Sequence, residues 1–74
     1  MIKFVLVSSG ANGMPFLDLE DFVGARALVN LTQVAAIKEY NEEPSVKSRI
    51  VVLGSSEHIY MKESVSEILS CLPY

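Results

Sequence analysis

Cysteine, histidine and tryptophan are almost absent from this chain of 74 residues, which contains one Cys, one His and no Trp. The single cysteine, Cys71, cannot form an intramolecular disulfide, so the disulfide framework of small secreted domains is excluded and a reducing, cytoplasmic setting is expected. A zinc site would have to combine His58 with Cys71 and carboxylates, and no short ligand spacing supports it. Catalysis by a His58 and Cys71 pair is also disfavoured, because Cys71 lies beside the apolar face of a predicted helix, where thiols more often pack than react. We expect no catalytic residue, no metal and no cofactor.

Basic residues and long apolar runs are scarce as well. Six Lys and Arg stand against nine Asp and Glu, and the net charge of −3 argues against general attraction to nucleic acid or anionic lipid. The apolar run at residues 4–7 is shorter than the core of a secretory signal, and nothing approaches the ~20 apolar residues of a membrane span. The acidic residues lack the regular alternation around a glycine turn that calcium loops need. We expect a soluble protein with no nucleic-acid, membrane or small-molecule partner.

The chain does contain enough apolar sequence for one small domain, residues 1–74. Half of its residues are hydrophobic and a fifth are charged, as in ordinary globular proteins. A domain of this size buries only roughly 60% of the surface that its unfolded chain exposes, so self-association is a reasonable way to add stability.

The first element expected is a β-hairpin. Residues 2–8 are apolar at nearly every position and predict a well-buried strand. Asn12 and Gly13 predict a tight turn, and residues 14–19 a second strand with Pro15 at an edge or at its start. A strand that runs into a glycine-rich stretch is also typical of dinucleotide-binding folds. Two features oppose that interpretation here: the position that requires a third small residue is occupied by Phe16, and the chain is too short for the repeated strand-helix units of such a fold. The hairpin is the favoured interpretation.

Residues 14–27 allow a strand, a helical turn or a loop. Asp18 could cap a short helix that runs through Phe22 and ends at Gly24, or the stretch could be a loop over the sheet. We favour one helical turn.

The second half of the chain reads as further strands and turns. Leu31 and Val34 are expected to point inwards from a turn, and Pro44 lies in a polar connection. The strands expected are residues 27–30, 35–41, 49–53 and 58–62, with a hairpin loop at residues 54–57.

The last element is predicted as an amphipathic helix from Ser64 to Leu72. Ser64 and Glu67 stand three residues apart and form a capping box, in which each side chain satisfies a free backbone N–H of the other residue. Val65, Ile68 and Leu69 then recur with Leu72 at the spacing of one helical face. Pro73 is expected to end the helix.

A row of polar side chains in the strand before this helix is a candidate interaction surface. Alternation sends Ile59 and Met61 to one face and His58, Tyr60 and Lys62 to the other. The row is either a solvated outer face or part of a contact surface, because aromatic and amphipathic residues often occur in interfaces.

Two motifs carry a family resemblance: VNLTQV, from Val29 to Val34, and KESVSEI, from Lys62 to Ile68. With the strands and hairpin between them, these residues resemble the small bacterial flagellar-region proteins of the FlbD type, over residues 28–69. The resemblance implies a small cytoplasmic accessory protein and supplies no catalytic residues.

More distantly, the same order of hairpin and helix is similar to part of the LytTR-type DNA-binding domains. That resemblance implies a DNA-binding regulator, which would rely on four basic residues gathered on one face. They are Arg26, Lys47, Arg49 and Lys62.

These observations predict an α+β fold, a mostly antiparallel, twisted sheet of four or five short strands with the C-terminal helix over one face. The predicted core consists of Phe4, Leu6, Leu31, Val34, Ile37, Ile50, Val52, Ile59, Met61, Val65, Ile68, Leu69 and Leu72. The function expected is a non-enzymatic cytoplasmic interaction or accessory module. Its partner is another protein or a second copy of the chain, with self-association through a sheet edge or through the His58, Tyr60 and Lys62 face favoured. A DNA-binding regulator is the alternative, and a small hydrolase or metal enzyme is the second alternative.

Overall fold

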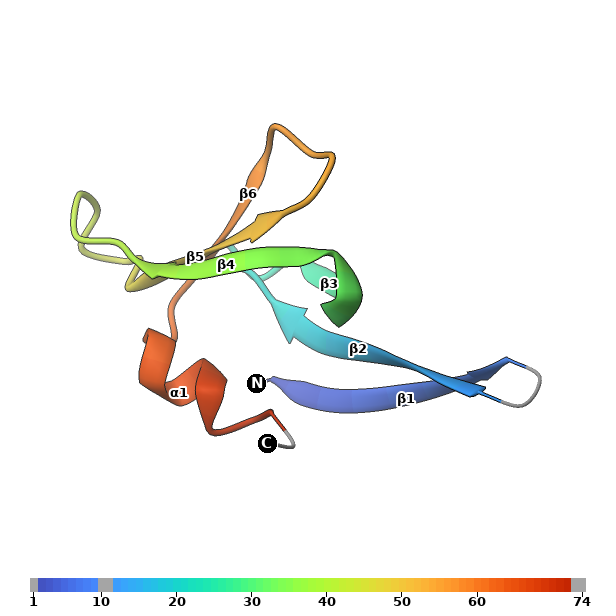
Figure 1. The fold of residues 1–74 in the computed structure, drawn as a ribbon. Coiled ribbons are helices and arrows are strands. Elements are labelled where there is room, and N and C mark those ends of the chain that lie inside the picture. Colours follow the sequence, from blue (N-terminus) through green and yellow to red (C-terminus); the bar gives the residue numbers. More distant parts are fainter. Residues whose placement is uncertain (1, 10–11, 73–74) are drawn as a thin grey trace.

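The computed structural model describes residues 2–9 and 12–72, which form two three-stranded antiparallel sheets, a 3-10 turn and one short helix. Sheet A contains β1 (Lys3–Ser9), β2 (Asn12–Glu20) and β3 (Arg26–Asn30), and sheet B contains β4 (Val34–Glu39), β5 (Ser48–Val52) and β6 (His58–Met61). The turn η1 (Leu31–Gln33) joins the two sheets, and helix α1 (Val65–Leu69) follows β6. In Figure 1 the β1–β2 hairpin reaches out to the right from beneath sheet B, whereas α1 lies on the left.

The predicted single sheet of four or five strands is wrong, although the antiparallel pairing and the C-terminal helix are confirmed. The described residues form six strands, divided between two sheets at η1. Asn30 starts this turn, because its Oδ1 accepts hydrogen bonds from the Thr32 backbone N–H (2.9 Å) and the Thr32 hydroxyl (2.8 Å). The chain therefore leaves sheet A at Asn30, and Leu31 and Val34 pack against the core as predicted.

Sheet A begins with the predicted hairpin, but its turn lies earlier in the chain than expected. Asn12 and Gly13 already belong to β2, where they pair with Ser9 and Ser8, so the connection falls at residues 10–11, outside the described residues. No helix follows β1, which removes the basis of the nucleotide-binding interpretation. Pro15 pairs with Leu6 of β1 and lies beyond the end of β3, so β2 is flanked on one side only at this residue, as a proline requires.

The predicted helical turn around residues 18–24 is wrong. Asp18 lies in β2, and the chain reverses into β3 through a tight turn at residues 21–25. Asp21 closes this turn, because its Oδ1 accepts hydrogen bonds from the backbone N–H groups of Val23 (3.1 Å) and Ala25 (2.9 Å). Gly24 adopts a φ of 91°, a conformation that glycine reaches without strain. The Phe22 N–H donates to the carbonyl of Tyr60 (2.8 Å), so the turn also touches sheet B.

Sheet B places its apolar residues on one face by strand register. Ile37 of β4, Ile50 of β5 and Ile59 of β6 are paired across the sheet and contribute to the core. The register between β4 and β5 shifts between Val34 and Ala36, and this bulge lets both Val34 and Ile37 face inwards. The core face of sheet B is therefore continuous across all three strands.

Helix α1 is shorter than predicted, but its start is confirmed. Ser64 Oγ accepts from the Glu67 N–H (3.2 Å), and Glu67 Oε1 accepts from the Ser64 N–H (3.2 Å), which completes the capping box. Regular helix ends at Leu69, and the backbone N–H groups of Cys71 and Leu72 donate to carbonyls three residues earlier. Pro73 lies outside the described residues. The predicted helix from Ser64 to Leu72 is therefore a single capped turn that is followed by tighter turns.

One core cluster contains residues from both sheets and from α1. Its buried members are Ile2, Leu17, Leu19, Val29, Ile50, Met61 and Ile68. Three predicted core residues lie outside this cluster: Leu6 is 62% exposed, Leu69 is 54% exposed, and Val65 is half-buried but does not pack against it. Leu6 lies on the part of the hairpin that extends past β3, where no described element covers it. Leu17 and Leu19 contribute instead, because β2 is the central strand of sheet A.

Candidate functional site

The predicted row of His58, Tyr60 and Lys62 lies on the side of sheet B opposite the core. Ile59 and Met61 face the core, as the alternation predicted. His58 and Tyr60 are half-buried, and the exposed Lys62 directly follows the end of β6. The row is therefore only partly solvated, because the ring of Tyr60 is packed by its neighbours.

Tyr60 is the centre of a group of rings. Its ring meets that of Tyr40 edge to face, with 5.1 Å between centroids, and that of Phe22 at 6.2 Å. The ring of His58 lies 6.4 Å away in a tilted arrangement. Contacts of this kind fix ring orientation, so the group is a preformed aromatic surface.

Tyr40 carries a further contact with a cation. The Arg49 guanidinium lies over the Tyr40 ring, 5.9 Å from its centroid. Partial loss of solvation raises the pKa of Tyr40, and the nearby Glu42 carboxylate raises it further. The Nε of Arg49 is buried and has no hydrogen-bond partner among the described residues. Arg49 is therefore a cation that the aromatic group holds in place.

Strand register brings further cations to the same face. Lys38 of β4, Arg49 of β5 and Tyr60 of β6 are paired across the sheet and point the same way. The Tyr40 N–H donates to the Lys47 carbonyl (3.1 Å), which continues the pairing by one residue. We call this outer surface of sheet B the basic face. It consists of Lys38, Tyr40, Lys47, Arg49, His58, Tyr60 and Lys62.

The sequence analysis missed Lys38 and Tyr40 of this surface, and also Phe22, whose ring packs against Tyr60. The alternation of Lys38 with Tyr40 matches that of Lys47 with Arg49 and was the available signal. The register that places these pairs side by side cannot be read from one strand alone.

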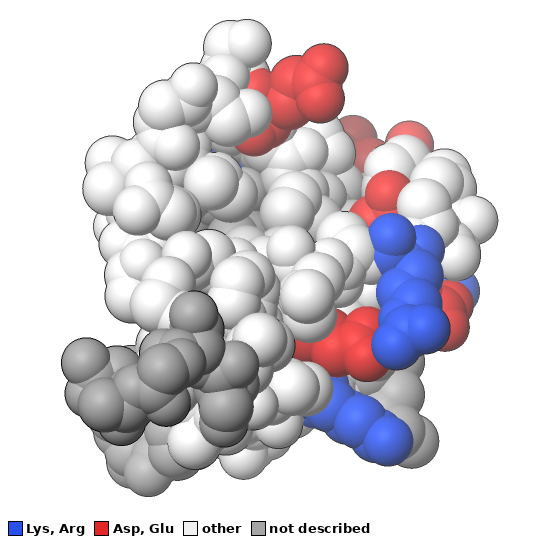
Figure 2. Space-filling view, turned by 90° about the vertical axis from the view of Figure 1, so that its right-hand side faces the viewer, with Lys and Arg blue, Asp and Glu red and all other residues white. Residues whose placement is uncertain are grey.

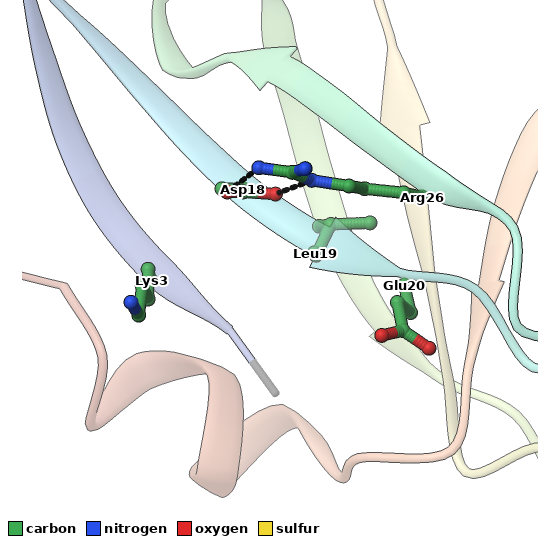
Figure 3. Close-up of a pocket in the computed structure, with 5 residues that line it drawn as sticks. All are labelled: Lys3, Asp18, Leu19, Glu20 and Arg26. Carbon is green, nitrogen blue, oxygen red and sulfur yellow. Dashed lines mark hydrogen bonds and ion pairs between the residues drawn. The ribbon is translucent and has the colours of Figure 1, made fainter.

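Arg26, in contrast, does not contribute a free cation. On the outer face of sheet A its Nε and Nη2 donate to the two carboxylate oxygens of Asp18, at 2.9 Å and 2.7 Å (Figure 3). The hydrogen bond from Arg26 lowers the pKa of Asp18, and the same bond raises the pKa of Arg26. Together with Lys3 and Glu20, the pair borders a shallow depression of about 240 Å³ in which two positive and two negative side chains balance. We interpret the Asp18 and Arg26 pair as a contact between neighbouring strands of sheet A and not as a binding site.

The residues considered for catalysis and metal binding are not brought together. Cys71 packs against the core cluster and its Sγ donates to the Glu67 carbonyl (3.5 Å), whereas His58 lies on the outer face of sheet B. Within the described residues, no three His, Cys, Asp or Glu side chains are grouped closely enough to hold a metal ion. No helix in this part of the chain is long and apolar enough to cross a membrane.

The β1–β2 hairpin forms a second candidate surface, which is apolar. Leu6 is 62% exposed on one side of the hairpin, and the paired residues Val7 and Met14 are 40% and 39% exposed on the other. We call the projecting part of this hairpin, residues 4–9 and 12–16, the hairpin arm. Figure 2 views the molecule from the side toward which the arm points, and the charged residues visible there gather at the top and over the lower right, whereas the left and centre hold none.

The chain was compared with protein-family models, with curated proteins and with solved structures, and none of the three comparisons found a match.

Proposed function

We propose that this chain is a small, non-enzymatic interaction module that self-associates through the hairpin arm. The observation that carries the proposal is the exposure of Leu6, Val7 and Met14 on both sides of a projecting hairpin. Exposed apolar groups that lie side by side on a small protein are typical of contact surfaces.

The open edge of β1 supports the same surface. Within the described residues β1 pairs with β2 on one side and with no strand on the other. Natural edge strands are commonly protected against pairing with another chain by inward-pointing charges, prolines or bulges. In β1 the one charged residue is Lys3, at the start of the strand. Antiparallel pairing of two β1 edges would join two copies of sheet A into one sheet of six strands.

A second copy of the chain is the partner that best fits this geometry. A two-fold contact between identical antiparallel edges is self-complementary and closes on itself, so it yields a dimer and no fibre. A standard interface covers roughly 800 Å² on each partner, about a sixth of the 4961 Å² surface of this chain. The proposal includes a reducing, cytoplasmic setting, which the free thiol of Cys71 supports.

The experiment compares the molar mass in solution of two matched variants, Leu6→Glu and Leu53→Glu. Leu53 is 57% exposed in the β5–β6 loop and matches Leu6 in size and exposure. We expect light scattering to give a dimer for the natural chain and for Leu53→Glu, and a monomer for Leu6→Glu, because two glutamates would face each other near the two-fold axis. Circular dichroism checks that both variants are folded.

Two results would overturn the proposal. One is a natural chain that stays monomeric at about 1 mM, where an association of only roughly 4 kcal/mol would already be half formed. The other is a dimer that Leu6→Glu and Leu53→Glu affect equally, which would locate the contact elsewhere.

A further inference from the structure

The net charge of −3 conceals a separation of charge between the two sheets. Four of the six Lys and Arg residues belong to the basic face, and the β4, β5 and β6 residues that point to that side include no carboxylate. In the part of the chain that the structure describes, Arg26 is the basic residue that pairs with a carboxylate, and no such ion pair involves Lys38, Lys47, Arg49 or Lys62. The basic face therefore gathers four cations that form no ion pair with a carboxylate of the described residues, although Glu42 lies beside Tyr40 at its edge.

Two depressions include Tyr60 among the residues that line them. One, of about 320 Å³, is lined by Phe22, Tyr40, Val46 and Tyr60, with Glu43 at its border. The other, of about 310 Å³, is bordered by Phe22, His58 and Tyr60 among others. Aromatic rings form part of the wall of both hollows, and carboxylates also border them, Glu43 in the first and Asp21 and Glu57 in the second.

We propose that the basic face binds an extended single strand of nucleic acid, with bases against the Tyr40 and Tyr60 rings and phosphates near the lysines. Proteins that bind single strands without sequence preference combine a positive track for the backbone with aromatic side chains on which bases stack. Lys38, Arg49 and Tyr60 supply that combination within one row across the sheet, and Lys47 extends it.

The aromatic hollows favour a single strand over other polyanions. In a duplex the bases are stacked on each other and cannot enter hollows beside Tyr60, whereas an unpaired base is free to do so. An acidic peptide would match the lysines but has no flat rings for the two hollows. The guanidinium of Arg49, held over Tyr40, adds a cation at the edge of the stacking surface.

The test measures binding of a fluorescein-labelled thymidine 12-mer by anisotropy over a series of salt concentrations. Each phosphate that a cation neutralises contributes about 0.7 to the slope of log affinity against log salt for single strands, so four cations predict a slope of about −2.8. Lys47→Ala combined with Lys62→Ala should reduce the slope to about −1.4. Lys3→Ala removes one charge from sheet A and should leave the slope unchanged.

Two Tyr60 variants test the aromatic part separately. Tyr60→Leu should weaken binding at least tenfold at constant slope, whereas Tyr60→Phe keeps the ring and should bind as the natural chain does. Circular dichroism spectra and melting curves show whether Tyr60→Leu remains folded. Tyr40→Leu provides a second measurement if it does not.

Four outcomes would overturn the inference. They are no anisotropy change at the lowest salt concentration, equal binding of a duplex of the same length, tighter binding of a poly-glutamate peptide, and a slope that the lysine variants do not change. The measurement is repeated with the Leu6→Glu variant, which changes the hairpin arm and leaves every residue of the basic face in place. Loss of self-association with retained binding would separate the two proposals.

Discussion

The two sheets share one topology, three antiparallel strands in chain order, yet their outer faces differ in chemistry. The outer face of sheet A carries a balanced ion pair between Asp18 and Arg26 and an uncharged hairpin arm. The outer face of sheet B carries unpaired cations around fixed aromatic rings. The two sheets therefore share a backbone arrangement, and the residue types at alternate positions of their strands decide what each outer face can contact.

The largest effect is expected where the two sheets are alike, in their shared core. Leu17 of sheet A and Ile50 of sheet B are both fully buried. Leu17→Ala and Ile50→Ala should each lower the free energy of unfolding by about 2–5 kcal/mol, because each leaves a cavity in the same cluster. Urea unfolding followed by circular dichroism measures this. If the two variants show separate transitions, the sheets are independent units.

Leu6→Ala is the control for this comparison. Leu6 lies on the same face of sheet A as Leu17 but is 62% exposed. Within the monomer its truncation should change stability by no more than about 0.5 kcal/mol.

A smaller effect should follow from removing the Asp21 carboxylate, which closes the turn between β2 and β3. Asp21→Ala leaves the Val23 and Ala25 N–H groups without their acceptor and should cost about 1–2 kcal/mol. Asp21→Asn retains a side-chain oxygen and should recover most of that loss. Equal losses in the two variants would show that charge, and not the acceptor, matters at this position.

The capping box of α1 should contribute a similar or slightly smaller amount. Ser64→Ala removes the acceptor for the Glu67 N–H and should lower stability by about 1 kcal/mol. Ser66→Ala, at an exposed position of the same helix, is the matched control. A Ser64→Ala melting curve that coincides with that of Ser66→Ala would show that the cap is dispensable.

The smallest effect is expected from the Asp18 and Arg26 pair. The folded-state pKa of Asp18 is lowered from 3.8 by the Arg26 hydrogen bond, so its contribution to stability is present above pH 3.8 and is lost as the pH falls through the folded value. In the Asp18→Asn variant the melting temperature should therefore fall slightly less than in the natural chain as the pH is lowered. Glu20→Gln is the control. Because the Arg26 side chain is 78% exposed, salt should reduce the difference.

Local chemistry explains what could be predicted from the sequence. The capping box of Ser64 and Glu67 and the turn at Asn30 need only neighbouring residues, and both are confirmed. The turn at residues 21–25 was missed because either Asp18 or Asp21 could accept hydrogen bonds from the backbone N–H groups that follow it. Asp18 pairs with β3 and so belongs to a strand, which leaves Asp21 to close the turn. Leu6 was misplaced for a related reason, since its exposure depends on how far β3 extends along β2.

The candidate surfaces depend even more on pairing between strands. His58, Tyr60 and Lys62 could be placed on one face by alternation alone, but their neighbours Lys38 and Arg49 come from other strands. The interaction role of these residues and the FlbD-type resemblance stay predictions. The net charge of the whole chain hid the basic face, because it does not show that four of the six basic residues share one face of sheet B.

The hydrogen bond from the Phe22 N–H to the Tyr60 carbonyl links the turn of sheet A to the centre of the basic face. A ligand that moves β6 would pull on the end of β2, the strand that carries one side of the hairpin arm. Any resulting coupling between the two surfaces must act equally in both directions, because linkage between two binding equilibria is reciprocal. Dimerisation would then change nucleic-acid affinity by the same factor by which nucleic acid changes dimerisation.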